Sequence, residues 1–513
     1  VDIVIQIDEG KPYRLNDITL EGTKVFSNAQ VRQSIRLKPG EVASWGLIQK
    51  ASQSIRDFYG SRGYIRTDVN AEVEDDAALG TADVQYHVTE GSLAYINNID
   101  IRGNTRTKDK VIRRELAVYP GEIYNEVKVR TSENRLRNLG YFSYVNSMSE
   151  GTLISNQYDL VLDVEEQKTG QFMVGAGFSS IDSILGFVEL SQGNFDLFGW
   201  PYFTGGGQKV KLRTQFGTER TDYELSFVEP WFLNRRLSLG LDLYHHDSRF
   251  LSDEYDQRNT GGSITLGKPL TSFDRLNLTY GLEEIQVLNV SSNASELIKQ
   301  EEGNRTKSYT TLEVVHDSRN NSFIPTRGNR SSISGTLAGG PLGGNTDLYG
   351  FQGRLSQFVS PWFDHVINLR GWAATVEEYG DSDRVPIFDR LFLGGARTVR
   401  AFAFRDVGPK DDTGEPIGGR SALYGTVEYT IPLAEKFRAA VFYDVGVVWE
   451  DTFAKSQSAV YVGDGAVNSG VGLGVRLDFP GFPIQLDYSW PIDADIYNDR
   501  SSGRFSFWIG YTY

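Results

Sequence analysis

Two residues are best suited to form a specific charge pair. One is an arginine in a long polar stretch, and the other is an aspartate in a strand-like stretch. Arg400 lies in Gly394-Gly-Ala-Arg-Thr-Val-Arg-Ala-Phe402, and Asp444 lies in Phe442-Tyr-Asp-Val-Gly446. A guanidinium group presents a planar fork to a carboxylate, and partial burial makes the two charges mutually dependent. The residues alone leave an alternative open, in which Arg400 is a solvated loop arginine and Asp444 is an ordinary polar residue.

Other residue types that support catalysis or metal binding form no recognisable pattern. The five His residues are scattered and lack the His-Glu-x-x-His spacing of a zinc-binding helix. The chain has no Cys for a disulfide or a thiolate metal site. Asp493, Asp495 and Asp499 lack the Gly and the closing Glu of a calcium loop. The Gly-rich stretch 204–208 lacks the Gly-Lys-Ser/Thr ending of a phosphate loop, and no nucleophile elbow occurs. We therefore predict no enzyme, no metal and no cofactor.

Composition limits the class of protein and its partners. The 513 residues carry a net charge of −15, which argues against a nucleic-acid binder. No apolar run approaches the roughly 20 residues of a membrane helix. A membrane β-barrel stays possible because its polar lumen lowers the mean hydropathy. The chain begins at Val1 without a signal peptide, and we interpret it as a mature or trimmed fragment.

From about residue 168 onward, the sequence around the two motifs predicts a series of β-strands. Apolar residues alternate with polar ones, as in Leu237, Leu239, Leu241 and Leu243. Alternate residues of a strand point to opposite faces, so each strand has one apolar and one polar face. A soluble sandwich would show the same alternation.

Three further features favour a transmembrane barrel. The strands are numerous, and no helix-length segment interrupts them. Short connections alternate with long polar ones such as 289–307 and 405–420, as periplasmic turns and external loops do. Aromatic residues collect at strand ends as in an interfacial girdle: Trp231, Phe232, Trp362, Phe363, Trp449, Trp490, Tyr511 and Tyr513. At roughly 20 residues per strand and loop, the region predicts about 16 antiparallel strands. The polar lumen is then the place for Asp444, and Phe442 on the same face should point inward beneath the loop.

The first third of the chain contains a repeat of a βααββ unit. The two copies start with similar segments, Leu15-Asn-Asp-Ile-Thr-Leu-Glu-Gly22 and Ile96-Asn-Asn-Ile-Asp-Ile-Arg-Gly103. The alignment continues without a gap as far as a Pro-Gly-Glu sequence that both copies contain. The closing strand occurs three times, at 2–10, 83–91 and 159–166. We therefore expect residues 1–10 to close a preceding module, which implies at least one more module upstream. Complete modules are expected at 11–91 and 92–167, followed by the barrel at 168–513.

These units resemble POTRA domains, the polypeptide-transport-associated repeats of outer-membrane assembly proteins. The loop motif is similar to the sixth-loop V-R-G-F motif of the same family of barrels, and the strand motif to its F-x-D-x-G motif. The family residues are Val399, Arg400, Ala401 and Phe402 in the loop, and Phe442, Asp444 and Gly446 in the strand. Ala401 replaces the family's Gly, so either positive φ is not required there or the loop tip differs.

The resemblance implies an α+β periplasmic part followed by an all-β transmembrane barrel in a bacterial outer membrane. It implies the central subunit of a machine that folds and inserts unfolded outer-membrane proteins. The implied partners are these clients, periplasmic lipoprotein subunits and outer-membrane lipid, with no nucleotide and no nucleic acid. A translocation-and-assembly relative for autotransporters, a two-partner secretion pore and a passive porin stay as alternatives.

The last expectation is a weak seam where the first and last barrel strands must meet. Gly175 and Gly177 lie in the first strand, and Gly510 lies in the last one, between Phe507 and Tyr513. Gly weakens a strand interior and often marks a bend. A bend at Gly510 would leave ladder hydrogen bonds unmade, and in lipid such an edge seeks a new strand. The alternative is that Gly510 only makes room for a neighbouring aromatic ring.

Overall fold

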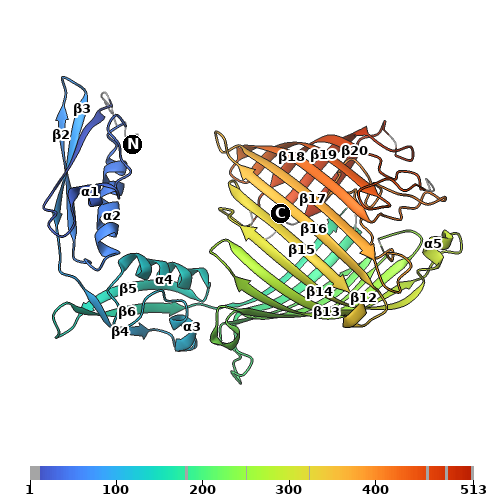
Figure 1. The fold of residues 1–513 in the computed structure, drawn as a ribbon, viewed down its shortest axis with the longest axis horizontal. Coiled ribbons are helices and arrows are strands. Elements are labelled where there is room, and N and C mark those ends of the chain that lie inside the picture. The colour runs from blue at the N-terminus through green and yellow to red at the C-terminus, as the bar shows by residue number, and fades with distance from the viewer. Residues whose placement is uncertain are drawn as a thin grey trace, which may run out of the picture. The chain divides into compact units, whose positions relative to one another are not determined.

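The computed structural model describes residues 12–179, 183–249, 251–322, 324–457, 461–479, 483–498 and 500–509 (Figure 1). The expected closing strand at 1–10 lies outside these residues. The chain divides into two compact units, of which one comprises 1–169 with 193–207 and the other 170–192 with 208–513. The segment 193–207, in the region expected to form the barrel, thus clusters with the modules. No helix among the described residues is both long and apolar enough to cross a membrane.

The first unit contains two copies of the same βααββ fold, and each copy has a three-stranded sheet. In both sheets the last strand lies in the middle, parallel to the first strand and antiparallel to the second. The first module consists of β1 Arg14–Glu21, α1 Asn28–Arg32, α2 Trp45–Gly60, β2 Asp68–Asp76 and β3 Thr81–Thr89. The second consists of β4 Tyr95–Arg102, α3 Asp109–Arg113, α4 Glu126–Asn138, β5 Phe142–Gly151 and β6 Gln157–Glu166.

Each module has its own core between the helices and the sheet. In the first module, α2 buries Ile48, Ile55 and Tyr59 against Val84 of β3. The second core forms in the same way, with Leu136 of α4 among its members. Ser27 caps α1, since its hydroxyl accepts a hydrogen bond from the N–H of Gln30 in a capping box.

A glutamate at the end of the central strand ties each module together. The N–H of Val25 donates to the Glu90 carboxylate, and the N–H of Arg106 donates to the Glu166 carboxylate at 2.9 Å in both cases. Just before each loop, Gly22 and Gly103 adopt φ of +86° and +92°, and a Cβ would lie 2.2 Å or less from a strand carbonyl oxygen. We call this repeated arrangement the glutamate clasp.

The second unit is a 16-stranded antiparallel sheet rolled into a barrel, in which every strand pairs with its sequence neighbour (Figure 1). The expected fold class is therefore confirmed. The first eight strands are β7 Gly170–Ser179, β8 Ser183–Phe195, β9 Gln208–Gly217, β10 Arg220–Glu229, β11 Ser238–Ser248, β12 Asp256–Pro269, β13 Asp274–Leu288 and β14 Gly303–Asp317. The others are β15 Gly328–Ala338, β16 Leu348–Val359, β17 Val366–Glu378, β18 Ser421–Ala434, β19 Phe437–Trp449, β20 Asn468–Leu477, β21 Ile484–Asp493 and β22 Arg504–Ile509.

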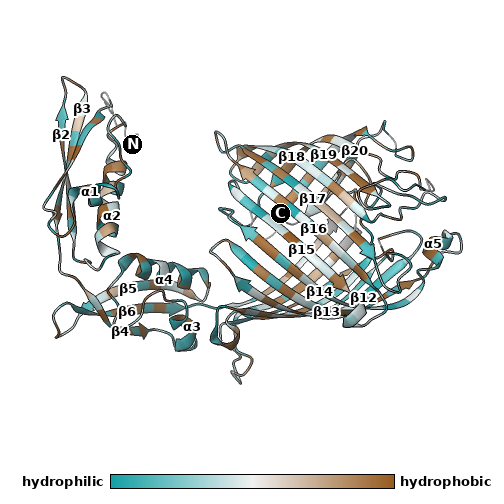
Figure 2. Ribbon diagram, in the orientation of Figure 1, coloured by the Kyte–Doolittle hydropathy of each residue, from teal (hydrophilic) through white to brown (hydrophobic). Residues whose placement is uncertain are grey.

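The alternation of apolar and polar residues along each strand gives the barrel its apolar outer band. Leu225 of β10 pairs with Leu212 of β9 on one side and with Leu243 of β11 on the other, and all three are exposed on the outside. Figure 2 shows brown and teal residues alternating along the strands. Short helical turns occur in the connections at α5 Glu296–Lys299, η1 Phe232–Asn234 and η2 Gly340–Leu342.

The sheet begins at β7 and ends at β22, and no ladder joins these two strands over the residues that the structure describes. The strands nevertheless lie side by side. Phe507 pairs with Leu486 of β21, while Gly510 and Tyr513 lie outside the described part of the chain. Gly175 and Gly177 belong to a regular ladder with β8, without a register shift. A Cβ at Gly175 would lie 2.4 Å from Cε1 of Phe187, so this glycine makes room for a cross-strand ring.

Candidate functional site

The tip of the long loop between β17 and β18 is inserted against the inner wall of the barrel. Turn hydrogen bonds shape it, among them those from the N–H of Phe402 to the Val399 carbonyl and from the N–H of Gly394 to the Thr398 hydroxyl. Val399, Ala401 and Phe402 are buried in an apolar cluster with Val448 of β19. These contacts leave Arg400 with 1 % exposure, directed at the strands beneath.

Arg400 and Asp444 form a bidentate ion pair. The Arg400 Nε donates to Asp444 Oδ2 at 2.8 Å, and Nη2 donates to Oδ1 at 2.8 Å. The backbone N–H of Arg400 also donates to Oδ2, at 3.1 Å. Asp444 is as buried as its partner, so one carboxylate fixes both the side chain and the backbone of the loop tip.

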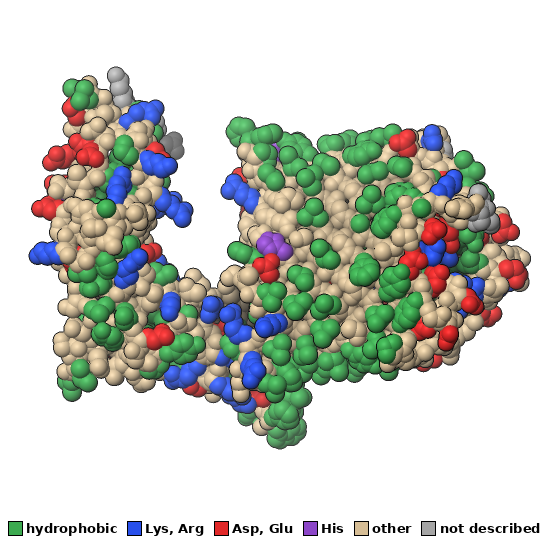
Figure 3. Space-filling model, viewed as in Figure 1, with side chains coloured by type: hydrophobic (Ala, Val, Ile, Leu, Met, Phe, Trp, Pro, Cys, Tyr) green, Lys and Arg blue, Asp and Glu red, His purple; other side chains and the backbone are tan. Residues whose placement is uncertain are grey.

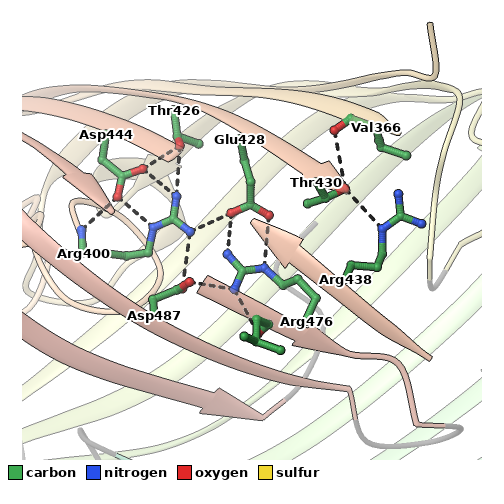
Figure 4. A network of polar contacts seen from close by, with 10 residues as sticks. Val366, Arg400, Thr426, Glu428, Thr430, Arg438, Asp444, Arg476 and Asp487 are labelled. Carbon is green, nitrogen blue, oxygen red and sulfur yellow. Dashed lines mark hydrogen bonds and ion pairs between the residues drawn. The ribbon is translucent and has the colours of Figure 1, made fainter. Parts of the chain in front are cut away.

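The pair belongs to a larger charge network across four strands (Figure 4). Nη1 of Arg400 donates to Glu428 of β18 at 2.7 Å and to Asp487 of β21 at 3.4 Å. Arg476 of β20 bridges the same two carboxylates, with Nη2 at 2.6 Å from Glu428 and Nη1 at 2.6 Å from Asp487. Two guanidinium groups therefore face three carboxylates, and this local set of five carries one net negative charge.

Phe442 supports the arginine from below. Its ring is buried, and the centroid lies 3.3 Å from the Cζ atom of Arg400, a cation–π contact. Thr426 completes the contacts, since its hydroxyl accepts from Nη2 of Arg400 at 3.2 Å and donates to Asp444 at 2.5 Å. The guanidinium is thus held by carboxylates at its edge and an aromatic ring at its face.

Glycines in β19 and β20 provide the space for this arrangement. A Cβ at Gly472 would lie 2.2 Å from Cζ of Phe442, and one at Gly470 would lie 2.5 Å from the methyl group of Ala401. A Cβ at Gly446 would lie 2.7 Å from Cγ2 of Val399. Ala401 does not adopt positive φ, so the conformational freedom of Gly is not required there. Its methyl group instead packs on the glycine surface of β20.

Two family matches cover most of the chain and decide its class. Residues 203–513 match the Omp85 superfamily domain. The chain belongs to the Omp85 superfamily. Residues 13–91 and 94–167 of this Omp85 chain match the POTRA family, described as a surface antigen variable number repeat.

Relatives of this Omp85 chain are named as assembly factors. It is 26 % identical to the outer membrane protein assembly factor BamA of Nitratidesulfovibrio vulgaris, over 98 % of this chain and 62 % of that protein. It is also 26 % identical to BamA of Neisseria meningitidis serogroup B, over 100 % of this chain and 68 % of that protein. The human sorting and assembly machinery component 50 homolog is 26 % identical over 73 % of this chain and 79 % of its own length. The chain thus spans about two thirds of the length of the BamA relatives.

Solved structures of Omp85 proteins share the fold. The crystal structure of BamA from Haemophilus ducreyi lacking POTRA domains 1–3 aligns with a TM-score of 0.74 at 21 % identity, over 97 % of this chain and all of that one. CdiB from Acinetobacter baumannii aligns with a TM-score of 0.53 at 14 % identity, over 98 % of this chain and 91 % of that one. The BamA matches and the POTRA repeats confirm the expected localisation in the bacterial outer membrane, with the modules in the periplasm.

Sequence reasoning placed Arg400 and Asp444 together but missed their partners in this Omp85 barrel. The missed partners are charged residues at inward positions, namely Glu428 of β18, Arg476 of β20 and Asp487 of β21. Alternation could have assigned each to the lumen, since Val427, Tyr488 and Val475 beside them belong to the opposite face. Within the described residues, no group of His, Asp or Glu could hold a metal ion.

Proposed function

We propose that this Omp85 chain is the central subunit of a machine that folds and inserts unfolded outer-membrane proteins. Its relatives named BamA and their assembly function support this, as does the greater structural likeness to BamA than to CdiB. Its partners are unfolded barrel clients, periplasmic lipoprotein subunits and outer-membrane lipid. The protein acts by presenting surfaces and catalyses no covalent chemistry.

The observation that carries this proposal is that no ladder joins β7 to β22 over the part of the chain that the structure describes. A strand edge in lipid leaves N–H and C=O groups without partners, and each such group costs several kcal/mol. A client strand that pairs with the edge removes this cost. The client then extends its own sheet strand by strand and leaves when its barrel closes.

In this mechanism, the charge network under the loop has a positioning role. It connects the loop between β17 and β18 to β18, β19, β20 and β21, which are the strands leading to the β22 edge. A fixed wall keeps the edge strand in a defined place, and β22 itself stays available for exchange. Arg400 and Asp444 are therefore positioning residues, while β7 and β22 contact the client.

Site-specific photo-crosslinking tests contact between the client and the edge. A photoreactive phenylalanine analogue replaces Val174 of β7, which is 67 % exposed. The control position is Ile333 of β15, which is 72 % exposed and lies far along the sheet. Adducts with a radiolabelled nascent barrel are expected at 174 only. Equal adducts at both positions would contradict pairing at the edge.

Locking the seam tests whether it must open. The chain contains no cysteine, so Val174→Cys and Phe505→Cys provide a unique pair of thiols on the outward face. Position 175 is unsuitable because a side chain there meets Phe187. Cleavable bismaleimides of increasing length should abolish client insertion while the barrel stays folded, and cleavage should restore it. Full insertion with complete crosslinking would refute the mechanism.

A further inference from the structure

The turn between β8 and β9 exposes an unusual concentration of large apolar side chains. Phe198, Trp200 and Tyr202 are 85 %, 80 % and 83 % exposed, and Leu197 beside them is 48 % exposed. No charged residue occurs from 197 to 208. We call residues 197–203 the aromatic tip. A contiguous exposed apolar surface of this kind marks a contact with another protein or with a membrane.

The base of this turn is built to hold the tip in place. Asn194 is buried, donates to the Thr107 hydroxyl at 2.8 Å and accepts from the N–H of Gly207 at 2.8 Å. Asp196 is also buried and forms an ion pair with Lys108. The N–H of Lys108 in turn donates to the Gly205 carbonyl at 2.9 Å. The base is thus fixed on both sides of the turn, at Asn194 and Asp196 and at Gly205, to the loop before α3.

The tip itself is internally ordered. The Phe195 and Phe203 rings stack with centroids 6.0 Å apart, and Trp200 meets Phe203 edge to face at 5.5 Å. The N–H of Phe203 donates to the Gly199 carbonyl at 2.7 Å. The turn therefore uses its hydrogen bonds and ring contacts to hold its own shape, while Phe198, Trp200 and Tyr202 stay largely exposed.

Chain connectivity places the tip on a membrane surface. The modules end at β6, and β7 begins at Gly170 on the same side of the bilayer as the modules. The chain crosses once in β7 and returns in β8, so the β8–β9 turn emerges on that side, between two transmembrane strands. A turn in this position has lipid headgroups beside it, and Trp and Tyr are the side chains favoured at that depth.

The charge next to the base fits the same partner. The stretch that leads into and through α3 carries five cations and two anions from 106 to 115. Lys108 contacts Asp196, and Arg114 donates to the Gly207 carbonyl at 3.5 Å, so these cations lie beside the turn. Figure 3 shows green side chains gathered on the projecting turn and blue ones next to it. Basic residues beside an apolar tip match the anionic headgroups of a phospholipid leaflet.

We propose that the aromatic tip is an interfacial anchor that inserts Phe198, Trp200 and Tyr202 into the headgroup region of the periplasmic leaflet. The partner is phospholipid, with the cations around α3 next to the phosphate groups. This inference needs only a membrane-spanning barrel, and it does not rest on the insertion of clients.

A single-cysteine fluorescence experiment on the full chain tests the anchor. The chain has no native cysteine, so Phe198→Cys carries one polarity-sensitive fluorophore, and the control is Leu79→Cys, an exposed apolar residue in the β2–β3 turn. Both are reconstituted into vesicles of phosphatidylethanolamine and phosphatidylglycerol. A blue-shifted emission and several-fold quenching by lipids spin-labelled near the headgroup are expected at position 198 and absent at position 79.

Two outcomes would overturn the proposal. A label at 198 that stays in water, like the one at 79, means that the tip does not enter lipid. A blue shift that depends on protein concentration and resists the lipid quencher means that a protein, such as a second copy of this chain, covers the tip. A triple variant, F198S/W200S/Y202S, labelled at Leu197→Cys, should lose the quenching seen in the otherwise unchanged chain while the barrel remains folded.

Discussion

At the scale of single residues, Arg400 is the side chain on which most of the buried charge depends. It contacts three carboxylates and a ring, and it shares two of these carboxylates with Arg476. A buried charge that loses its partner is costly, whereas a complete pair is close to neutral relative to apolar packing. The network therefore specifies one position for the loop more than it adds stability.

Arg400→Ala is expected to destabilise the barrel by about 3–5 kcal/mol, because it leaves Asp444 buried without a countercharge. Arg400→Lys should recover little, since an ammonium group cannot supply two parallel hydrogen bonds. The temperature at which the barrel loses its compact mobility in mildly denaturing electrophoresis measures this. Arg354→Ala, whose side chain donates to the neutral Gln352, is the control. An unchanged midpoint for Arg400→Ala would show that the pair does not stabilise the barrel.

Gly472→Ala is expected to cost about 1–3 kcal/mol, because the added methyl group forces a shift in a packed site. Its Cβ would lie 2.2 Å from the Phe442 ring and 2.8 Å from the Tyr488 carbonyl oxygen. Gly353→Ala in β16 is the matched control, since a Cβ there meets nothing within 4 Å. Denaturant midpoints of the two variants in detergent provide the comparison. Equal effects would mean that strand propensity and not contact with Phe442 decides the cost.

The sequence could predict part of this site but not all of it. Arg400 and Asp444 stand in recognisable motifs, and alternation assigns Asp444 and Phe442 to the lumen. Alternation cannot say which strands a loop tip will reach, and Glu428, Asp487 and Arg476 come together only because β18, β20 and β21 curve around one point. The sequence also does not predict the role of the glycines of β20. Their role is visible only in the structure, where Phe442 and Ala401 pack against them.

At the scale of elements, the glutamate clasp holds the first loop of each module to its central strand. Burial raises the pKa of Glu166, but hydrogen bonds from Thr107, Thr105 and Arg106 outweigh it and lower the pKa below the usual glutamate range. Burial likewise raises the pKa of Glu90, but hydrogen bonds from the Tyr59 hydroxyl and the loop N–H groups outweigh this and lower it. The carboxylate form is thus the one that the fold stabilises.

A lowered pKa fixes the direction of the pH dependence. The contribution of the clasp is complete above the ordinary glutamate pKa of about 4.3 and is lost as the pH falls through the lower folded value. Glu166→Gln removes this dependence and weakens the bonds to the loop. Hydrogen exchange of peptides covering 103–108 should be faster in Glu166→Gln at neutral pH. It should be unchanged in Glu165→Gln, an exposed neighbour, and equal protection in both variants would contradict the clasp.

The elements themselves were largely predictable, since the βααββ repeat and the strand alternation set their order. The cap of the first helix is at Ser27 because Gln30 completes a capping box with it. The attachment of the β8–β9 turn to the first unit was not predictable. It depends on Asn194 and Asp196 meeting Thr107 and Lys108, which lie about 90 residues earlier and share no pattern with them.

At the scale of the whole molecule, the two units have separate cores and should unfold separately. Calorimetry of the full chain in detergent is expected to show two transitions. Arg400→Ala should lower only the transition of the barrel, and Glu166→Gln should lower only that of the modules. A single transition that shifts with both substitutions would show that the two units unfold as one cooperative body.

The glutamate clasp also bears on how such chains change in length over evolution. Glu90 closes the module that contains it, and Glu166 does the same in the next module, so neither borrows its clasp from a neighbour. A gene segment that is duplicated or deleted between the end of one clasp and the start of the next strand carries a complete folding unit. Complete modules can therefore be gained or lost one at a time. The clasp of the module next to the barrel does not have to change when this happens.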